Sequence, residues 1–82
     1  MYQVRLQPLA EKFLKKMDVS DQKGVIKRLR SLEQNSKLGK PLTSNLTGLW
    51  SLRFGKYRAI YKINEGELII FILDINHRAK VY

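Results

Sequence analysis

Residues 50–63, WSLRFGKYRAIYKI, predict a β-hairpin whose two faces differ in chemistry. Gly55-Lys56 suits a two-residue turn, and apolar residues alternate with polar ones on both sides of it. Because successive side chains of a strand point to opposite faces, one face collects Trp50, Leu52, Phe54, Ala59, Tyr61 and Ile63. The other face collects Ser51, Arg53, Arg58 and Lys62. We expect the two arginines to lie side by side on an open face, where a phosphate would relieve their repulsion.

The N-terminal half predicts one strand and two helices. Tyr2, Val4 and Leu6 alternate with polar residues, which is typical of a strand with one buried face. Pro8 and the fourfold spacing of Leu9, Phe13 and Met17 then predict a short amphipathic helix over residues 8–17. A second helix follows the break at residues 18–21, with Asp18 or Ser20 as its cap. Its apolar stripe consists of Val25, Ile26, Leu29 and Leu32.

The remaining segments are a long loop and one more strand. Residues 35–48 are rich in Ser, Gly, Pro, Asn and Thr, and a loop of this length is a candidate for function. A turn at Glu65-Gly66 leads into the run from Leu68 to Leu73, which is apolar on both faces and therefore predicts a central strand.

These elements predict an α+β fold. The order β-α-α-β-β-β gives a two-layer domain, an antiparallel sheet from the C-terminal half joined by the N-terminal strand, with the helical hairpin packed on one face. A chain of 82 residues is expected to form a single domain over residues 1–82.

Composition narrows the function classes. Sixteen basic residues against seven acidic ones leave a net charge of +9, which favours a polyanionic partner such as nucleic acid, the ribosome or an acidic protein. There is no cysteine and only one histidine, so disulfides and a zinc site of four Cys/His ligands are excluded. The longest apolar run has six residues, and no leader pattern opens the chain, so we expect a cytoplasmic protein that does not bind membranes.

Each candidate residue also has an ordinary structural interpretation. Alternating Arg and Lys are common on a solvated face, and Asp74 could reduce the arginine site to a salt bridge. His77 alone suggests a loop residue without a catalytic role. Trp50 is more typical of a core than of a stacking platform, and Tyr82 could be a frayed end.

The C-terminal half resembles the RelE branch of the RelE/ParE toxin superfamily. That branch reads as Leu-x-Gly-aromatic, a basic strand, Gly-x-Tyr-Arg-x-x-Tyr, an apolar strand and His-Arg-x-x-x-Tyr. The corresponding segments here, in the same order and spacing, are residues 46–50, 51–54, 55–61, 68–73 and 77–82. In the N-terminal half the likeness is one of element order only.

The resemblance implies a ribosome-dependent endoribonuclease that cuts mRNA in the decoding site and needs neither a metal nor another cofactor. The ribose 2'-hydroxyl next to the cleaved bond would attack phosphorus and leave a cyclic phosphate and a free 5'-hydroxyl. Arg58 matches the phosphate-stabilising arginine of the family, and Arg78 matches its partner. Arg53 matches one of two basic strand positions.

The other position departs from the family, because Ser51 stands where better-known members carry a lysine. Arginine is a poor proton acceptor, so His77 becomes a candidate base or acid. Tyr82 matches the terminal tyrosine that stacks on a base or transfers a proton. The candidate RNA-binding residues are Lys56, Lys62, Lys80 and Ser51.

Three functions stay open within the superfamily. The constellation of Arg58, His77-Arg78 and Tyr82 favours the ribonuclease, while the same fold in the ParE branch poisons DNA gyrase. The third function is a basic RNA-binding module without activity, which stays open because position 51 lacks the lysine of the family. For the toxins we expect a cognate acidic, RelB-like antitoxin, which folds on the toxin and with it could bind operator DNA. The ribosome and mRNA would be the targets.

Overall fold

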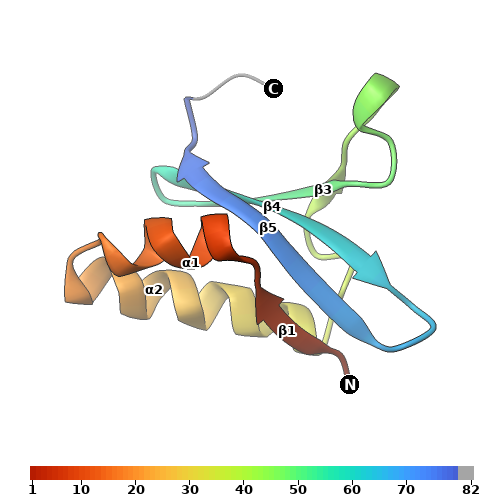
Figure 1. Cartoon of the computed structure of the whole chain (residues 1–82), viewed down its shortest axis with the longest axis horizontal. Coiled ribbons are helices and arrows are strands. Elements are labelled where there is room, and N and C mark those ends of the chain that lie inside the picture. Colours follow the sequence, from red (N-terminus) through yellow and green to blue (C-terminus); the bar gives the residue numbers. More distant parts are fainter. Residues whose placement is uncertain (80–82) are drawn as a thin grey trace.

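The sheet and the helices form separate layers in the structure, a computed structural model that describes residues 1–79 apart from the side chain of Ser44. The elements in chain order are β1 (Gln3–Leu6), α1 (Pro8–Lys15), α2 (Val19–Arg30), η1 (Ser31–Glu33), β2 (Lys40–Pro41), η2 (Ser44–Leu46), β3 (Trp50–Phe54), β4 (Tyr57–Asn64) and β5 (Ile69–His77). Figure 1 shows α1 and α2 running side by side along one face of the sheet. The predicted α+β class and the order of its main elements are confirmed.

The antiparallel sheet expected from the C-terminal half is confirmed, and the N-terminal strand, whose direction was not predicted, makes the whole sheet mixed. Its strand order is β1-β5-β4-β3-β2, and β2 to β5 pair antiparallel with their neighbours. β1 joins β5 in parallel. Parallel neighbours cannot be joined by a tight turn, and here the chain between β1 and the rest of the sheet contains both helices. The run that was predicted as a central strand is accordingly interior, flanked by β1 and β4.

Two strand boundaries differ from the prediction. β2, with only two residues, lies inside the segment expected to be a loop, and its Pro41 is tolerated because the strand is at the sheet edge. β5 begins one residue late, since Leu68 belongs to the turn with a φ of 58°, and it continues to His77. His77 is therefore the last residue of a strand, which corrects its placement in a loop.

The core lies between the helices and the sheet, as the alternation predicts. Leu52, Ala59 and Tyr61 are buried in it, while Trp50 packs beside them with its ring stacked on Tyr61. The predicted apolar stripe is wrong at one residue in each helix, Leu9 in α1 and Ile26 in α2. In α1 the buried residues are Ala10 and Leu14, and Leu9 is 61% exposed. In the second stripe Val25, Leu29 and Leu32 are buried as predicted, whereas Ile26 is 43% exposed.

A buried tyrosine fastens the chain before β2. The Tyr61 hydroxyl donates to the Ser36 carbonyl at 2.9 Å and accepts from the Gly39 N–H at 3.0 Å. Gly39 has no space for a side chain, because an added Cβ would clash with the Ser51 carbonyl oxygen and approach the Tyr61 hydroxyl to 2.9 Å. The segment that leads into β2 is thereby held against the sheet.

Candidate functional site

The candidate site lies on the open face of the sheet, which we define as the face turned away from α1 and α2. Strand register sets its residues in rows. In the first row Arg53 pairs with Arg58, and Arg58 with Asn76. In the second row Lys40 pairs with Ser51, Ser51 with Ile60, and Ile60 with Asp74. The expected juxtaposition of Arg53 and Arg58 is confirmed.

A β-bulge determines which residues of β5 share this face. Ile60 pairs with Asp74 but Tyr61 pairs with Ile72, so Leu73 is the extra residue. Without the bulge, uninterrupted alternation from Ile72 would turn Asp74 and Asn76 toward the helices. The bulge reverses the alternation and brings both side chains to the open face.

The first row combines two cations with a small polar network. Arg53 is exposed, whereas Arg58 is half-buried between Arg53 and the buried Asn76. The Asn76 amide donates to a carboxylate oxygen of Asp74 at 2.8 Å. Asp74 is a diagonal neighbour of Arg58 across the two strands, which is within reach of a long side chain. The row can therefore hold a phosphate on a rigid strand pair while Asp74 offsets part of the positive charge.

A pocket of about 440 Å³ continues from this row around the exposed edge of β3, beyond the end of β2. Its polar walls are Arg53, Arg58 and Ser51 from the hairpin, Lys40 from β2, and Arg28 from α2. The apolar part of the lining comes from Leu38, Gly39, Pro41, Leu42 and Leu52. In the part of the chain that the structure describes, this lining contains four cationic side chains and no carboxylate.

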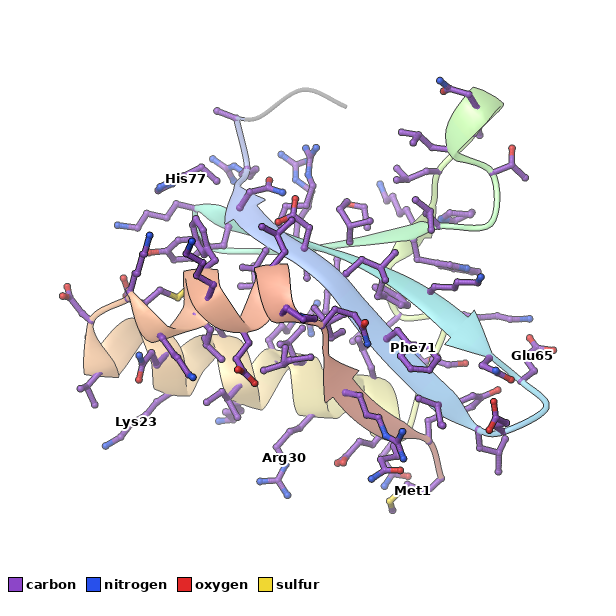
Figure 2. All side chains as sticks on the ribbon, viewed as in Figure 1. Met1, Lys23, Arg30, Glu65, Phe71 and His77 are labelled. Atoms are coloured by element: carbon purple, nitrogen blue, oxygen red, sulfur yellow. The ribbon has the colours of Figure 1, made fainter. Side chains whose placement is uncertain are left out.

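His77 lies on the opposite, helix-covered face. It pairs with Tyr57, and its ring centroid is 5.5 Å from that of Tyr57 and 5.9 Å from that of Phe13 in α1. Figure 2 labels it at the end of β5, above α1. The structure therefore does not bring His77 together with Arg53 and Arg58, because the bulge that turns Asn76 to the open face turns the next residue toward the helices.

The aromatic group around His77 is tied to α2. The Tyr57 hydroxyl donates to a carboxylate oxygen of Asp21 at 3.0 Å. Burial raises the pKa of Tyr57 above its ordinary value, and the hydrogen bond to Asp21 raises it further. Lys56, in the turn between β3 and β4, places its ammonium 5.6 Å from the centre of the Tyr57 ring. Lys56 thus packs at the helix side of the hairpin and not in the arginine row.

The other predicted residues are distributed along the open face or lie outside the description. Lys62 is exposed opposite Phe71, two residues past Ile60 in β4. The Arg78 N–H donates to the Lys56 carbonyl at 2.8 Å, which extends the ladder by one residue. Arg78 itself lies in the turn that follows β5 and is exposed. Lys80 and Tyr82 lie outside the described residues.

Sequence reasoning missed Arg28, Lys40 and Asn76. Asn76 follows Asp74 by two residues, a same-face spacing that could have linked them. No local signal identified Arg28 or Lys40, since both reach the site only through long-range packing of α2 and β2 beside β3. Within residues 1–79, no cluster of three His, Asp or Glu side chains could hold a metal ion. No helix in the same range is long and apolar enough to cross a bilayer.

Comparison with known families gives a match over nearly the whole chain. A family model described as the ParE toxin of the type II toxin-antitoxin system, parDE, matches residues 4–82. Two curated relatives come from Mycobacterium tuberculosis. Toxin RelG is 41% identical over 46 residues, or 56% of this chain, and toxin RelE is 41% identical over 51 residues, or 62% of this chain. Each match spans about half of the relative, 53% of its length.

Solved structures resemble this chain over a longer range. The RelBE2 toxin-antitoxin complex from Mycobacterium tuberculosis contains a chain that is 32% identical, with a TM-score of 0.87 and coverage of 94% of this chain and 98% of that one. The isolated RelE toxin of E. coli has a TM-score of 0.81 at 13% identity and covers 99% of this chain and 88% of that one. At that identity the second comparison shows the fold alone.

Proposed function

The chain belongs to the ParE toxin family of type II toxin-antitoxin systems, and we propose that it is an endoribonuclease that cuts mRNA in the ribosomal A site. The observation that supports this proposal most directly is the pairing of Arg53 with Arg58 on a sheet face that neither helix covers. A guanidinium pair supplies planar, bidentate donors to phosphoryl oxygens. The names of the two curated relatives, RelG and RelE, agree with this branch of the superfamily.

In the proposed reaction the ribose 2'-oxygen attacks the neighbouring phosphorus. The new bond joins the 2'-oxygen to phosphorus, and the bond between phosphorus and the 5'-oxygen breaks. The 2'-hydroxyl proton passes to a base, and an acid supplies a proton to the leaving 5'-oxygen. The products are a 2',3'-cyclic phosphate and a 5'-hydroxyl, so atoms and charges balance without an oxidant or reductant.

Arg58 and Arg53 would neutralise the charge that develops on the phosphoryl oxygens, and Arg78 would approach from the end of β5. Donors that are already in position lower the barrier, because they need no reorganisation when the charge develops. Asp74 and Asn76 would position Arg58 without touching the substrate. We assign proton transfer to Tyr82, the role that the family resemblance gives to this residue, and we leave His77 out of the site because it lies on the other face.

Gyrase poisoning is the second candidate, and the description of the matched family model as a ParE toxin favours it. Gyrase poisoning would not require Arg53 and Arg58 to bind a phosphate. An RNA-binding module without activity is the third, because Ser51 leaves one basic strand position without a cation.

One paired experiment separates these functions. Purified protein is added to an in vitro translation reaction and to a gyrase supercoiling assay. Cuts in A-site mRNA with 5'-hydroxyl ends support the ribonuclease, and gyrase inhibition without cuts supports the second candidate. Ribosome binding with neither effect supports the third.

We further propose an acidic, RelB-like antitoxin as the partner. The net charge of +9 favours an acidic chain, and the structure that is 32% identical was solved as a toxin-antitoxin complex. Such a partner binds the folded toxin only, so it should raise the melting temperature as its concentration rises. Whether the complex binds operator DNA is tested by a mobility shift with the upstream DNA, with the toxin alone as control.

A further inference from the structure

The pocket at the exposed edge of β3 lies beside the arginine row but extends beyond it, and the proposed reaction does not use its outer wall. We propose that this pocket binds the phosphodiester next to the cleaved one, with Arg28 and Lys40 as its ligands. The substrate class is single-stranded RNA. This inference rests on the proposed ribonuclease function and deepens it, since it assigns a second subsite on the same substrate strand.

The charge of the pocket suits a phosphate. Arg28, Lys40, Arg53 and Arg58 line it. Over residues 1–79, the ion pairs of the structure involve other cations, Lys15, Arg30 and Lys37, and leave Arg28, Lys40 and Arg53 without a carboxylate partner. Arg28, Lys40 and Arg53 repel one another around this concave surface, and an anion bound between them removes that repulsion.

The spacing of the rows suits consecutive nucleotides. Ser51 and Arg53 are two residues apart in β3, so the row of Lys40 and the row of Arg58 are separated by about 7 Å. This separation is comparable to one nucleotide step of an extended strand. Ser51, directly opposite Lys40, has a short side chain, which leaves space in the pocket and offers a hydroxyl to the same phosphate.

The backbone that leads into Lys40 is anchored before RNA arrives. Gly39 precedes it, is bonded through its N–H to the Tyr61 hydroxyl, and has no space for a Cβ. Tyr61 is fully buried and also holds Ser36. A ligand whose backbone is anchored in this way loses less conformational entropy on binding than a lysine on a loose loop.

Arg28 closes the pocket from the helix side and has a matched neighbour. It is half-buried in α2, whereas Lys27 is exposed and lines a separate surface recess with Lys23, Ile26 and Arg30. Substitution of Lys27 removes the same charge from the same helix without touching the pocket. Lys27→Gln is therefore the control for Arg28→Gln.

The first test measures binding of free RNA. Fluorescence anisotropy with a short, 2'-O-methylated oligonucleotide, which cannot be cut, gives the dissociation constant over a series of salt concentrations. Arg28→Gln and Lys40→Gln are each expected to weaken binding about fivefold to tenfold and to reduce the salt slope by about one. Lys27→Gln is expected to change the dissociation constant by less than about twofold. Equal effects of all three variants would overturn the inference.

The second test locates the phosphate. Ribosomes are programmed with mRNAs in which an uncharged methylphosphonate replaces the phosphodiester on the 5' or the 3' side of the cut. In single-turnover cleavage with excess toxin, one of these mRNAs should raise the half-saturating toxin concentration of the wild type. The same mRNA should not raise the half-saturating concentration of Lys40→Gln any further. The maximal rate of the wild type on this mRNA should stay within about twofold of its rate on unmodified mRNA. Additive effects on both mRNAs would mean that Lys40 contacts ribosomal RNA instead, and would overturn the inference.

The outcomes separate this inference from the proposed function. If the wild type does not cut mRNA, the proposed function fails, and the oligonucleotide titration still decides whether the pocket binds RNA. If the wild type cuts and the pocket variants behave like Lys27→Gln, only the subsite fails. If Arg28→Gln and Lys40→Gln bind RNA normally but lose the acidic antitoxin, the pocket is a protein-docking site and the inference is overturned. Denaturation midpoints equal to that of the wild type show that the variants are folded.

Discussion

The two faces of the sheet come from the same strands but follow different physical rules. The helix-covered face is filled by large apolar side chains such as Ile70, Ile72 and Ile75, which have no exposed surface. The open face places Arg53 beside Arg58 and Lys40 beside Ser51. Burial of apolar area stabilises the first face, whereas like charges opposite each other destabilise the second. The difference indicates that the covered face maintains the fold, and it is the basis of our proposal that the open face binds an anionic ligand.

The largest expected effect is on the covered face. Ile72→Ala removes a fully buried side chain that packs in the core, and it should lower the free energy of unfolding by about 2–5 kcal/mol. Phe71→Ala, its half-buried neighbour on the open face, should have half this effect or less. Urea denaturation followed by circular dichroism measures both. Similar losses for the two variants would contradict the assignment of the faces.

A substitution on the open face should have its largest effect on the rate of mRNA cleavage and little effect on stability. Arg58→Ala should reduce the rate of mRNA cleavage by about a hundredfold to a thousandfold, as expected for the loss of a donor to a developing oxyanion. Arg30→Ala is the control, because Figure 2 shows Arg30 pointing away from the sheet on the outer face of α2. Single-turnover cleavage measures the rates. Undiminished cleavage by a folded Arg58→Ala protein would remove Arg58 from the mechanism.

Tyr61 connects the two faces, because its ring is in the core and its hydroxyl holds the segment before Lys40. Tyr61→Phe loses the hydrogen bonds to Ser36 and from Gly39, and should cost about 1–3 kcal/mol of unfolding free energy. If the hydroxyl positions Lys40, RNA binding should weaken as well, by up to the effect of Lys40→Gln. A stability loss without any change in RNA affinity would mean that β2 is held by other contacts.

Alkaline pH should weaken the covered face. Burial raises the pKa of Tyr61, although the Gly39 N–H lowers it in part, and burial also raises the pKa of Tyr57. The unfolded chain therefore loses these protons near pH 10, before the folded one does. The stabilisation is complete below about pH 10 and is lost as the pH rises through the folded pKa values. Urea denaturation between neutral and alkaline pH should show a shallower decline for Tyr57→Phe than for the wild type, and an equal decline would contradict the shift.

The smallest effect is expected for His77. His77→Asn changes a ring that packs on Phe13 and Tyr57 on the covered face, so cleavage should stay within about threefold of the wild type. The pH profile of the cleavage rate should keep its shape. A loss of more than a hundredfold in a folded variant, or a limb of the pH profile that disappears, would show that His77 reaches the substrate after all.

Much of the fold could be predicted because its signals are local. The alternation around Gly55-Lys56 predicted both strands of the hairpin and the pairing of Arg53 with Arg58, since the register of a two-residue turn follows from its length. The helices were predicted as well. The fourfold spacing, however, placed Leu9 in the buried stripe, whereas the structure buries Ala10 instead. A small residue carries little weight in an apolar pattern, although it allows close packing against the sheet.

The sequence by itself determined the α+β class, the covered face of the hairpin and the juxtaposition of two arginines on the other. Only the tertiary structure decided which residues join them. β2 has two residues and a proline, too short for alternation to be visible, so the position of Lys40 opposite Ser51 depends on long-range pairing and on the anchor at Tyr61. The bulge at Leu73 reverses the alternation of β5, so that Asp74 and Asn76 face the arginines and His77 faces the helices. Periodicity shows which face a side chain occupies only within one uninterrupted element. An inserted residue moves the following side chains to the other face without changing the pattern on either side of it, and the pairing with a distant strand leaves no local pattern at all.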